Sequence, residues 1–189
     1  METKSELRKR ILNIRNNMSE DDVINKSNLI MNKLTLLEEY KNAKTVFVYM
    51  SFKSEVSTTN LVKKMLDENK RVVIPYTDTK NTVIIPSELK SIDDDLILNS
   101  FGYYEPVYEK IKRVEPEEFD LIVTPGVVFD RNLNRVGFGK GYYDRILIRK
   151  RKDSKAVAVA YEFQVLDEVP AEDHDVKMDM IITEERIYQ

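Results

Sequence analysis

Short apolar runs alternate with helical patterns along this chain, and the alternation constrains the fold more than any other feature of the sequence. Residues 45–50, 71–76, 121–124, 156–161 and 180–183 have the apolar and β-branched composition typical of strands. The runs at 121–124 and 156–161 are apolar almost throughout, as expected of strands that are buried on both faces. Strands that alternate with helices predict an α/β fold, with a mostly parallel (mixed) sheet flanked by helices on both faces.

Capping residues predict where the helices begin. Thr3 and Glu6 form a capping box, and Leu7, Ile11 and Ile14 follow on one face of the helix that it opens. The same kind of polar start predicts further helices after Ser19 and after Ser57–Thr59, and another helix is expected to begin near Tyr142.

The stretch between residues 77 and 116 has a weaker pattern. Val83–Ile85 is a candidate strand, and Gly102–Pro106 is predicted to form a turn. The 189 residues of the chain, 42% of them hydrophobic, suffice for one sizeable core, and no linker or internal repeat divides them. We therefore expect a single domain that spans residues 1–189.

Charge and cysteine content exclude several classes of function. The net charge of −3 argues against a general nucleic-acid binder, which needs a basic surface. Since the chain has no cysteine, disulfides, thiolate catalysis and cysteine-based zinc sites are excluded. No apolar stretch approaches the ~18 residues that span a bilayer, and no signal-peptide core is present. We expect a cytoplasmic monomer with neither a membrane nor a nucleic-acid partner.

Glycine is scarce in this chain and concentrated at one place. Three of its five glycines are Gly137, Gly139 and Gly141, just before the helix expected near Tyr142. Glycine permits positive φ and lets a ligand approach the backbone closely. The N–H groups of such a loop, together with the helix dipole, favour an anion.

Charged side chains flank this loop. Arg135 and Lys140 add positive charge beside the backbone N–H groups, and arginine can grip a phosphate with two parallel hydrogen bonds. Asp144 could hold Mg²⁺ against that phosphate, because Mg²⁺ prefers hard oxygen ligands. The alternative is an ordinary glycine-rich turn with a solvated lysine. Two cations, two tyrosines and an aspartate around the loop favour phosphate binding.

The loop departs from two common nucleotide-binding motifs. Gly141 stands where a Walker A loop has serine or threonine after its lysine. Tyr142 stands where the dinucleotide fingerprint has its third glycine. The loop therefore belongs to neither of these motifs.

Two segments of the chain resemble the signature of a known family. They are Pro125–Asp130 (PGVVFD) and Arg135–Arg145 (RVGFGKGYYDR), and they are similar to the 5-formyltetrahydrofolate cyclo-ligases, or methenyltetrahydrofolate synthetases. The departures from the signature are Val136, where leucine is usual, and Phe138, at a variable position. The resemblance covers nearly the whole chain and includes residues 4–9, 51–58, 101–106, 164–170 and 174–175.

The resemblance implies an enzyme that uses ATP and Mg²⁺ to convert 5-formyltetrahydrofolate to 5,10-methenyltetrahydrofolate, with release of ADP and phosphate. It implies Lys140, Arg135 and Tyr143 as catalytic residues. It implies that ATP is bound by Lys4, Arg8, Arg135, Gly137, Phe138, Gly139, Lys140, Gly141, Tyr142 and Tyr143. The implied folate-binding residues are Met50, Glu55, Gly139, Lys140, Gly141, Tyr142 and Tyr143, and the implied Mg²⁺ ligands are Asp144 and Asp175.

Several of these residues also have simpler interpretations. Lys4 and Arg8 lie one turn apart on a helix, so they can point at one polyphosphate or belong to a solvated face. Glu55 could accept hydrogen bonds from a pterin, or it could be a charge near the start of a helix. Met50 could contact the folate or belong to the core. His174, the only histidine, lies between two aspartates and is more often a surface residue than an acid–base catalyst.

Two other functions fit parts of the sequence. A different Mg-ATP phosphotransferase would share the phosphate-binding loop but would have no particular use for Glu55. A nucleotide- or RNA-binding module without catalysis would use the loop and the basic run Arg149–Lys152, which is otherwise a solvated helix end. The negative net charge counts against RNA binding.

Overall fold

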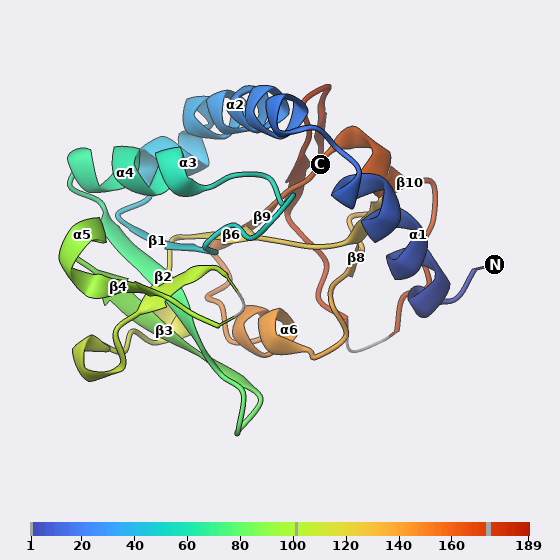
Figure 1. The fold of residues 1–189 in the computed structure, drawn as a ribbon. Helices are drawn as coiled ribbons and strands as arrows, with labels where there is room; N and C mark the ends of the chain where they lie inside the picture. The colour runs from blue at the N-terminus through green and yellow to red at the C-terminus, as the bar shows by residue number, and fades with distance from the viewer. Residues whose placement is uncertain (1, 101, 173–174) are drawn as a thin grey trace.

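The computed structural model describes residues 2–100, 102–172 and 175–189 of the chain. At its centre is a seven-stranded sheet, shown in Figure 1, with the strand order β12-β11-β9-β6-β1-β2-β3. The strands of this sheet are β1 (Thr45–Val48), β2 (Arg71–Asp78), β3 (Val83–Leu89), β6 (Leu121–Thr124), β9 (Lys155–Val159), β11 (Met180–Ile182) and β12 (Ile187–Tyr188).

The sheet is parallel at its centre and antiparallel at its two edges. β1 pairs in parallel with β2 and with β6, and β9 pairs in parallel with β6 and with β11. The edge strands β3 and β12 are each antiparallel to their neighbour. The predicted α/β fold with a mostly parallel, mixed sheet is confirmed.

Helices cover both faces of this sheet. In Figure 1, α2 (Glu20–Leu36), α3 (Glu38–Asn42) and α4 (Thr59–Asp67) lie over one face, and α6 (Tyr142–Leu147) lies against the other. Val46 and Val48 of β1 join the apolar cluster under α2–α4, whereas Phe47 joins the cluster that contains residues of α6. This burial on both faces explains why the central strands are apolar at successive positions. Among the described residues, no helix is long and apolar enough to cross a membrane.

The first helix, α1 (Lys4–Asn16), packs on a second, smaller sheet. That sheet has the order β10-β7-β8, formed by β7 (Val128–Asp130), β8 (Arg135–Val136) and β10 (Val165–Leu166). Leu7 and Ile11 of α1 share an apolar cluster with Val128 and Val136 of that sheet. The helix is therefore attached beside the central sheet rather than on it.

The capping box predicted at the start of α1 is confirmed, but the predicted apolar face was wrong at its last position. Ile14 is 43% exposed, whereas Arg15 is 4% exposed. Because side chains four residues apart lie on the same face of a helix, Arg15 continues the row formed by Leu7 and Ile11. A charged residue thus occupies the buried position that the sequence pattern assigned to isoleucine.

The region around residues 90–106 contains more regular structure than predicted. A short helix, α5 (Ile92–Asp95), leads into β4 (Leu96–Leu98), which pairs with β5 (Tyr104–Pro106). The turn predicted at 102–106 is therefore partly wrong, because its last three residues form β5. Phe101, which belongs to the family-like segment 101–106, lies outside the described residues. The described part of the chain also contains three short 3-10 helices, at Tyr108–Lys110, Pro116–Glu118 and Glu162–Gln164.

The loop between β1 and α4 is held by hydrogen bonds at both of its ends. The strand predicted at 45–50 ends at Val48, so the chain leaves the sheet two residues earlier than expected. The Thr58 hydroxyl donates to Tyr49 O at 2.7 Å and accepts a hydrogen bond from Ser51 N at 3.1 Å. Thr58 makes no side-chain cap for α4, contrary to the predicted capping; its hydroxyl fixes the loop instead.

Candidate functional site

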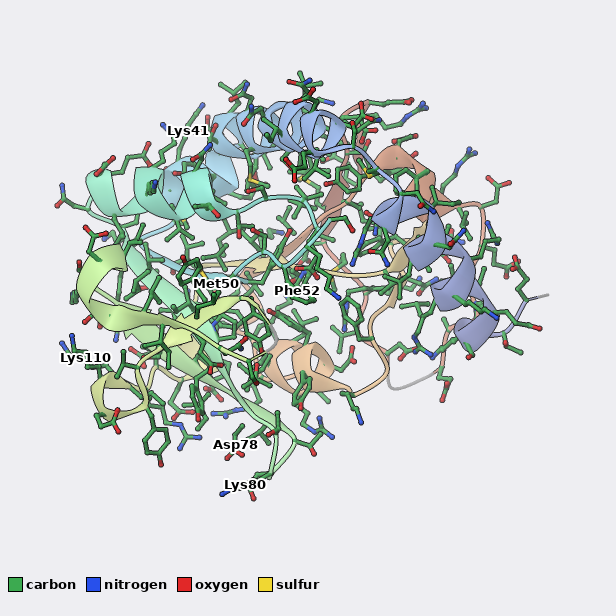
Figure 2. The ribbon with its side chains drawn as sticks, viewed as in Figure 1. Lys41, Met50, Phe52, Asp78, Lys80 and Lys110 are labelled. Atoms are coloured by element: carbon green, nitrogen blue, oxygen red, sulfur yellow. The ribbon has the colours of Figure 1, made fainter. Side chains whose placement is uncertain are left out.

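A cleft of about 800 Å³ opens at the carboxyl ends of the central parallel strands. Tyr49 and Met50, which directly follow β1, line the cleft, as does Pro125 directly after β6. Figure 2 shows Met50 and Phe52 in the middle of the molecule, between α4 and α6. Ligands of open α/β sheets usually bind at the carboxyl ends of the strands, and this volume suits a small molecule.

Every residue that the sequence analysis assigned to the site lines this cleft. They come from α1, from the loop after β1, from β8 and the loop that follows it, from the first turn of α6, and from the chain before β11. The structure thus brings together Lys4, Arg8, Met50, Glu55, Arg135, Gly137, Phe138, Gly139, Lys140, Gly141, Tyr142, Tyr143, Asp144 and Asp175. Their chemical roles stay predictions.

Arg135 is an enclosed cation in the wall of the cleft. Its side chain is 3% exposed, and its Nη2 donates to Asp144 Oδ1 at 2.6 Å. Gly137 leaves room for it, since a Cβ at that position would lie 2.7 Å from Arg135 Nη1. The guanidinium and the carboxylate are therefore held together beneath the glycine-rich loop.

The glycine-rich loop also contacts α1. Arg8 Nε donates to Gly137 O at 2.6 Å. The Arg8 guanidinium lies against Gly139, where an added Cβ would be 3.5 Å from Arg8 Cζ. Gly139 has a φ of +92° and Gly141 a φ of +66°, both in the region that favours glycine. The loop thus has a backbone conformation that few other residues adopt, beside a cation of the first helix.

The two lysines of the cleft differ in their partners. Lys4 Nζ donates to Asp175 Oδ2 at 2.7 Å and to Glu172 Oε1 at 2.8 Å. Lys140 is exposed and forms no ion pair with any residue that the structure describes. Lys140 can therefore meet an incoming anion without first leaving a carboxylate. His174, also considered in the sequence analysis, lies outside the described residues.

The carboxylates beside these cations fit a magnesium ion. Asp144 and Asp175 carry the hard oxygen atoms that Mg²⁺ prefers, and here they pair with Arg135 and Lys4. Within residues 2–100, 102–172 and 175–189, no group of three or more acidic or histidine side chains could hold a metal. Mg²⁺ at nucleotide sites is usually held by one or two carboxylates, phosphate oxygens and water. The donor set therefore suits an ion that binds together with a nucleotide.

Glu55 is the most deeply buried acidic group of the cleft. It is 8% exposed, and its Oε2 accepts a hydrogen bond from Phe52 N at 2.9 Å. Burial raises the pKa of Glu55 to about 7, while the Arg15 cation and the hydrogen bond from Phe52 oppose this rise. A carboxyl group with such a pKa changes its charge near neutral pH, so its surroundings decide whether it binds a ligand as an anion.

Aromatic side chains line the cleft near Glu55. Burial, and to a smaller extent the Glu55 carboxylate, raises the pKa of Tyr143 well above its ordinary value, so this tyrosine is a neutral phenol. Phe52 and Tyr103 meet edge to face, with their ring centroids 5.8 Å apart. Neither Phe52 nor Tyr103 was among the residues predicted for the site. Tyr103 directly precedes β5 and belongs to the family-like segment 101–106, which is the signal in the sequence that could have identified it.

The helix α1 extends from one part of the cleft to another. Lys4 and Arg8 at its start lie among the cations, whereas Asn16 at its end accepts a 2.9 Å hydrogen bond from Ser54 Oγ, next to Glu55. Lys4 and Arg15 lie about 16 Å apart along the axis of α1, because an α-helix rises 1.5 Å per residue. We therefore distinguish a cationic end of the cleft, formed by Lys4, Arg8, Arg135, Lys140 and the loop 137–141, from a Glu55 end, formed by Tyr49, Met50, Phe52, Glu55, Tyr103 and Tyr143.

Asp130, the acidic residue of the first family-like segment, holds the backbone rather than lining the cleft. It is fully buried, with 0% of its surface exposed. Its Oδ1 accepts hydrogen bonds from the backbone N–H groups of Asn132 and Asn134, each at 2.9 Å. Its Oδ2 accepts from Asn134 Nδ2 at 2.8 Å and from Val169 N at 3.1 Å. Asp130 therefore shapes the turn that precedes β8 and Arg135.

The basic run 149–152 is paired with acidic side chains. Arg149 contacts Glu115 and Glu117, and the next two basic residues of the run, Lys150 and Arg151, contact Asp179 and Asp120. These pairs leave little of the positive potential that an RNA surface requires. They favour the interpretation of this run as a solvated helix end.

Comparison with known proteins gives a consistent result. A model of the 5-formyltetrahydrofolate cyclo-ligase family matches residues 1–184. A 5-formyltetrahydrofolate cyclo-ligase of Haemophilus influenzae is 34% identical over 148 residues, which are 77% of this chain and 78% of the relative. The solved structure of 5,10-methenyltetrahydrofolate synthetase from Aquifex aeolicus has a TM-score of 0.85 and 38% identity, and the match covers 98% of this chain and 92% of the other. The corresponding protein from Mycoplasma pneumoniae has a TM-score of 0.77 and 28% identity, with 96% and 98% covered.

Proposed function

The chain belongs to the 5-formyltetrahydrofolate cyclo-ligase family, and on that premise we propose that it uses Mg-ATP to convert 5-formyltetrahydrofolate to 5,10-methenyltetrahydrofolate. ADP and phosphate are the other products. One observation carries the proposal. A single cleft joins a cationic end, suited to a polyphosphate, with a buried, partly aromatic end that holds one carboxylate.

The cationic end would bind the phosphates of ATP. Lys4, Arg8, Arg135 and Lys140 would neutralise the phosphate charges, and backbone N–H groups of the loop 137–141 would surround the transferred group. Lys140 and Arg135 would act on the charge that develops during transfer, since catalysis of phosphoryl transfer rests on positioning and electrostatic stabilisation. The exposed, unpaired Lys140 and the enclosed Arg135 support this division.

Asp144 and Asp175 are the residues that would hold Mg²⁺, directly or through water. The ion, when bound, would neutralise the phosphate oxygens and favour the departure of ADP. Lys4 and Arg135 would then be released from these carboxylates toward the phosphates.

The Glu55 end would bind the folate. The carboxylate of Glu55 would accept hydrogen bonds from the amide and amine of the pterin, because both of these groups are donors. Met50 and Tyr143 would contact the folate beside it. The edge-to-face pair of Phe52 and Tyr103 would add apolar contact to the rings of the substrate.

The reaction would proceed in two steps. First, the formyl oxygen on N5 attacks the γ-phosphate, and ADP leaves. N10 then attacks the formyl carbon, loses its proton, and the carbon–oxygen bond breaks to release phosphate. The new C–N bond closes the five-membered ring of the methenyl product. No covalent bond to the protein is required, because holding N5, N10 and the γ-phosphate in line supplies the advantage.

The first experiment is to mix the protein with 5-formyltetrahydrofolate and Mg-ATP and to follow the near-ultraviolet absorbance of 5,10-methenyltetrahydrofolate. We expect the chromophore to appear only when ATP and Mg²⁺ are both present. Folded protein that binds ATP yet yields no chromophore would contradict the folate assignment and leave only the phosphate-binding role.

A second experiment separates this function from that of another Mg-ATP phosphotransferase. Glu55→Gln should weaken the binding of 5-formyltetrahydrofolate by about 10- to 100-fold, because a charged acceptor contributes roughly 1.5–3 kcal/mol to a hydrogen-bonded contact. The binding of ATP should change less than about twofold, since the cationic end is untouched. Equal losses for both ligands would count against a pterin site at Glu55.

A further inference from the structure

We propose that Arg15 is a positioning residue for the folate site: a cation behind the cleft wall that favours the anionic form of Glu55, which accepts the donors of the pterin. This inference rests on the proposed role of Glu55 as a folate anchor. Arg15 does not line the cleft itself, so it would act through Glu55 and not on the substrate.

The first observation is the burial of a full positive charge. Arg15 is 4% exposed and lies in the row of α1 that otherwise packs Leu7 and Ile11. Its Nη1 donates to Gly126 O at 3.3 Å, and its guanidinium lies 5.8 Å from the centre of the Phe138 ring. Its Nε is buried and has no hydrogen-bond partner among the described residues. A buried arginine with so few partners is costly unless a nearby anion compensates it.

The second observation is that the end of α1, which carries Arg15, is tied to the loop that carries Glu55. Ser54 Oγ donates to Asn16 Oδ1 at 2.9 Å, so the residues directly after Arg15 and directly before Glu55 are hydrogen-bonded to each other. The loop is also closed on itself, because Glu55 N donates to Phe52 O at 3.1 Å and Phe52 N donates to Glu55 Oε2 at 2.9 Å. The end of α1 and the carboxylate are thus held in a set relation.

The third observation concerns the other titratable groups that interact electrostatically with Glu55. They are Tyr49 after β1, Tyr143 in α6 and Tyr161 after β9, and all three are phenols. Burial raises the pKa of Tyr49 and of Tyr143 well above the ordinary value, and raises that of Tyr161 to about 12. These tyrosines stay neutral near pH 7. Arg15 is therefore the cation among these groups that can oppose the effect of burial on Glu55.

The role differs from a purely structural one in its dependence on pH. Without the cation, burial alone would hold the proton on Glu55 to a higher pH, and a protonated carboxyl is a poorer acceptor for two donors. Loss of Arg15 should therefore weaken folate binding near neutral pH and spare it at high pH. A residue that merely packs α1 would weaken binding at every pH.

The test compares Arg15→Gln, which removes the charge, with Arg15→Lys, which keeps it. Gly126 O keeps a hydrogen bond in both variants, because Gln164 Nε2 also donates to it, at 3.2 Å. The side-chain carboxyl carbon of Glu55 is followed by NMR from pH 5 to pH 9 in the ligand-free protein and is assigned by its absence in Glu55→Gln. This signal is distinct from that of the single histidine, His174.

We expect the Glu55 midpoint to rise by at least about one pH unit in Arg15→Gln, as removal of a nearby opposite charge requires, and to stay near the wild-type midpoint in Arg15→Lys. If Arg15→Gln does not fold, Arg15→Met replaces it as the uncharged variant. An unchanged midpoint in a folded, uncharged variant would overturn the proposal.

The second readout is the dissociation constant of 5-formyltetrahydrofolate over the same pH range. In Arg15→Gln it should be about fivefold higher than in the wild type at pH 7, because a rise of one unit from about 7 leaves about a fifth as much of the carboxylate ionised, and it should converge with the wild type at pH 9. A loss of the same size that persists at pH 9 would identify a structural role instead. If the NMR midpoint moves but the wild-type protein does not bind this folate at any pH, the proposed function fails while the pairing of Arg15 with Glu55 stands.

Discussion

The two ends of the cleft hold their charges in opposite ways. At the cationic end, charges of both signs pair with each other, as Lys4 does with Asp175 and the enclosed Arg135 with Asp144, while Lys140 is exposed. At the Glu55 end, one carboxylate is withdrawn from water and has no ion pair shorter than 4 Å among the described residues. The first arrangement can exchange partners when a ligand arrives. The second sets the protonation state of one group in advance.

This difference predicts whether a mutation at each end should change catalysis, ligand binding or stability. Exposed charges contribute little to stability and can be removed without unfolding the protein, so their loss should appear in catalysis. A buried carboxyl influences folding through its pKa, so changes there should appear in both stability and binding. The four predictions below separate these outcomes, beginning with the largest expected effect.

The strongest test of the cationic end is Lys140→Ala. We expect turnover to fall by about 10²- to 10³-fold, as found when one group that stabilises the transition state is removed. The melting temperature should stay within about 1 °C, because an exposed side chain without an ion pair contributes little to stability. Lys152→Ala, at an exposed position away from the cleft, is the matched control and should keep full activity. Near-wild-type turnover in Lys140→Ala would remove this lysine from the proposed chemistry.

The strongest test of the Glu55 end is the pH dependence of stability. The folded pKa of about 7 lies above the ordinary value of 4.5, so between these pH values the folded protein holds a proton that the unfolded chain has lost. Stability contributed by this group therefore falls as pH rises from 4.5 to 7, by an amount on the order of 3 kcal/mol.

Glu55→Gln removes this dependence. Relative to the wild type, its free energy of unfolding should increase steadily between pH 4.5 and pH 8, as measured by urea denaturation at each pH. The contributions of all other titratable groups to the pH dependence are the same in both proteins, so they cancel when the two free energies of unfolding are subtracted. A difference that stays constant over this range would show that Glu55 is not held protonated by burial.

The third prediction concerns Asp130, whose hydrogen bonds shape the turn that precedes Arg135 of the cationic end. Asp130→Asn should lower the free energy of unfolding by about 2–3 kcal/mol, because one carboxylate oxygen that accepts hydrogen bonds becomes a donor. Asp153→Asn, at an exposed position, should change stability by less than about 0.5 kcal/mol. The fraction of Asp130→Asn that is still folded should keep most of the wild-type activity. Lost activity without lost stability would place Asp130 in the chemistry instead.

The smallest expected effect lies at the contact between α1 and the Glu55 end. Ser54→Ala removes the hydrogen bond to Asn16, which is exposed, and should lower stability by about 0.5–1 kcal/mol. Because the contact ties the end of α1 to the loop that carries Glu55, we expect a rise of about two- to threefold in the dissociation constant of the folate, since 1.4 kcal/mol corresponds to tenfold. ATP binding is the internal control and should not change.

The same comparison explains how much of the site could be predicted from the sequence. The glycine loop, Arg135, Lys140 and Asp144 fall within one short segment, so their pattern is visible before folding. Glu55, Lys4 and Asp175 come from distant segments with ordinary local patterns. Their assignment depended on the resemblance to a family, since nothing in their spacing distinguishes them from solvated charges.

The fold itself was predictable where periodicity was strong. The strand at 121–124 was predicted with its observed bounds, and the start of α6 at Tyr142 was also correct. The β4–β5 pair was missed because its strands are three residues long and partly exposed, so they carry no clear alternation. Arg15 was missed for a different reason. Hydrophobic patterns assume that buried positions are apolar, and this helix buries a charge.

The attachment of α1 has a consequence for how the two substrates influence each other. The buried residues of α1 are two apolar ones, Leu7 and Ile11, and the charged Arg15. With so few buried apolar contacts, undocking of this helix should require less free energy than unfolding of the sheet. ATP bound to Lys4 and Arg8 would favour the docked state, and so would folate bound at Glu55, whose loop is hydrogen-bonded to the end of α1 through Ser54 and Asn16. Amide hydrogens of α1 should then exchange more slowly when either substrate is present. Thermodynamic linkage requires that each substrate raise the affinity of the other by the same factor. Cooperativity between the two ends of the cleft would thus arise from the ordering of one helix, with no movement of the strands that carry it.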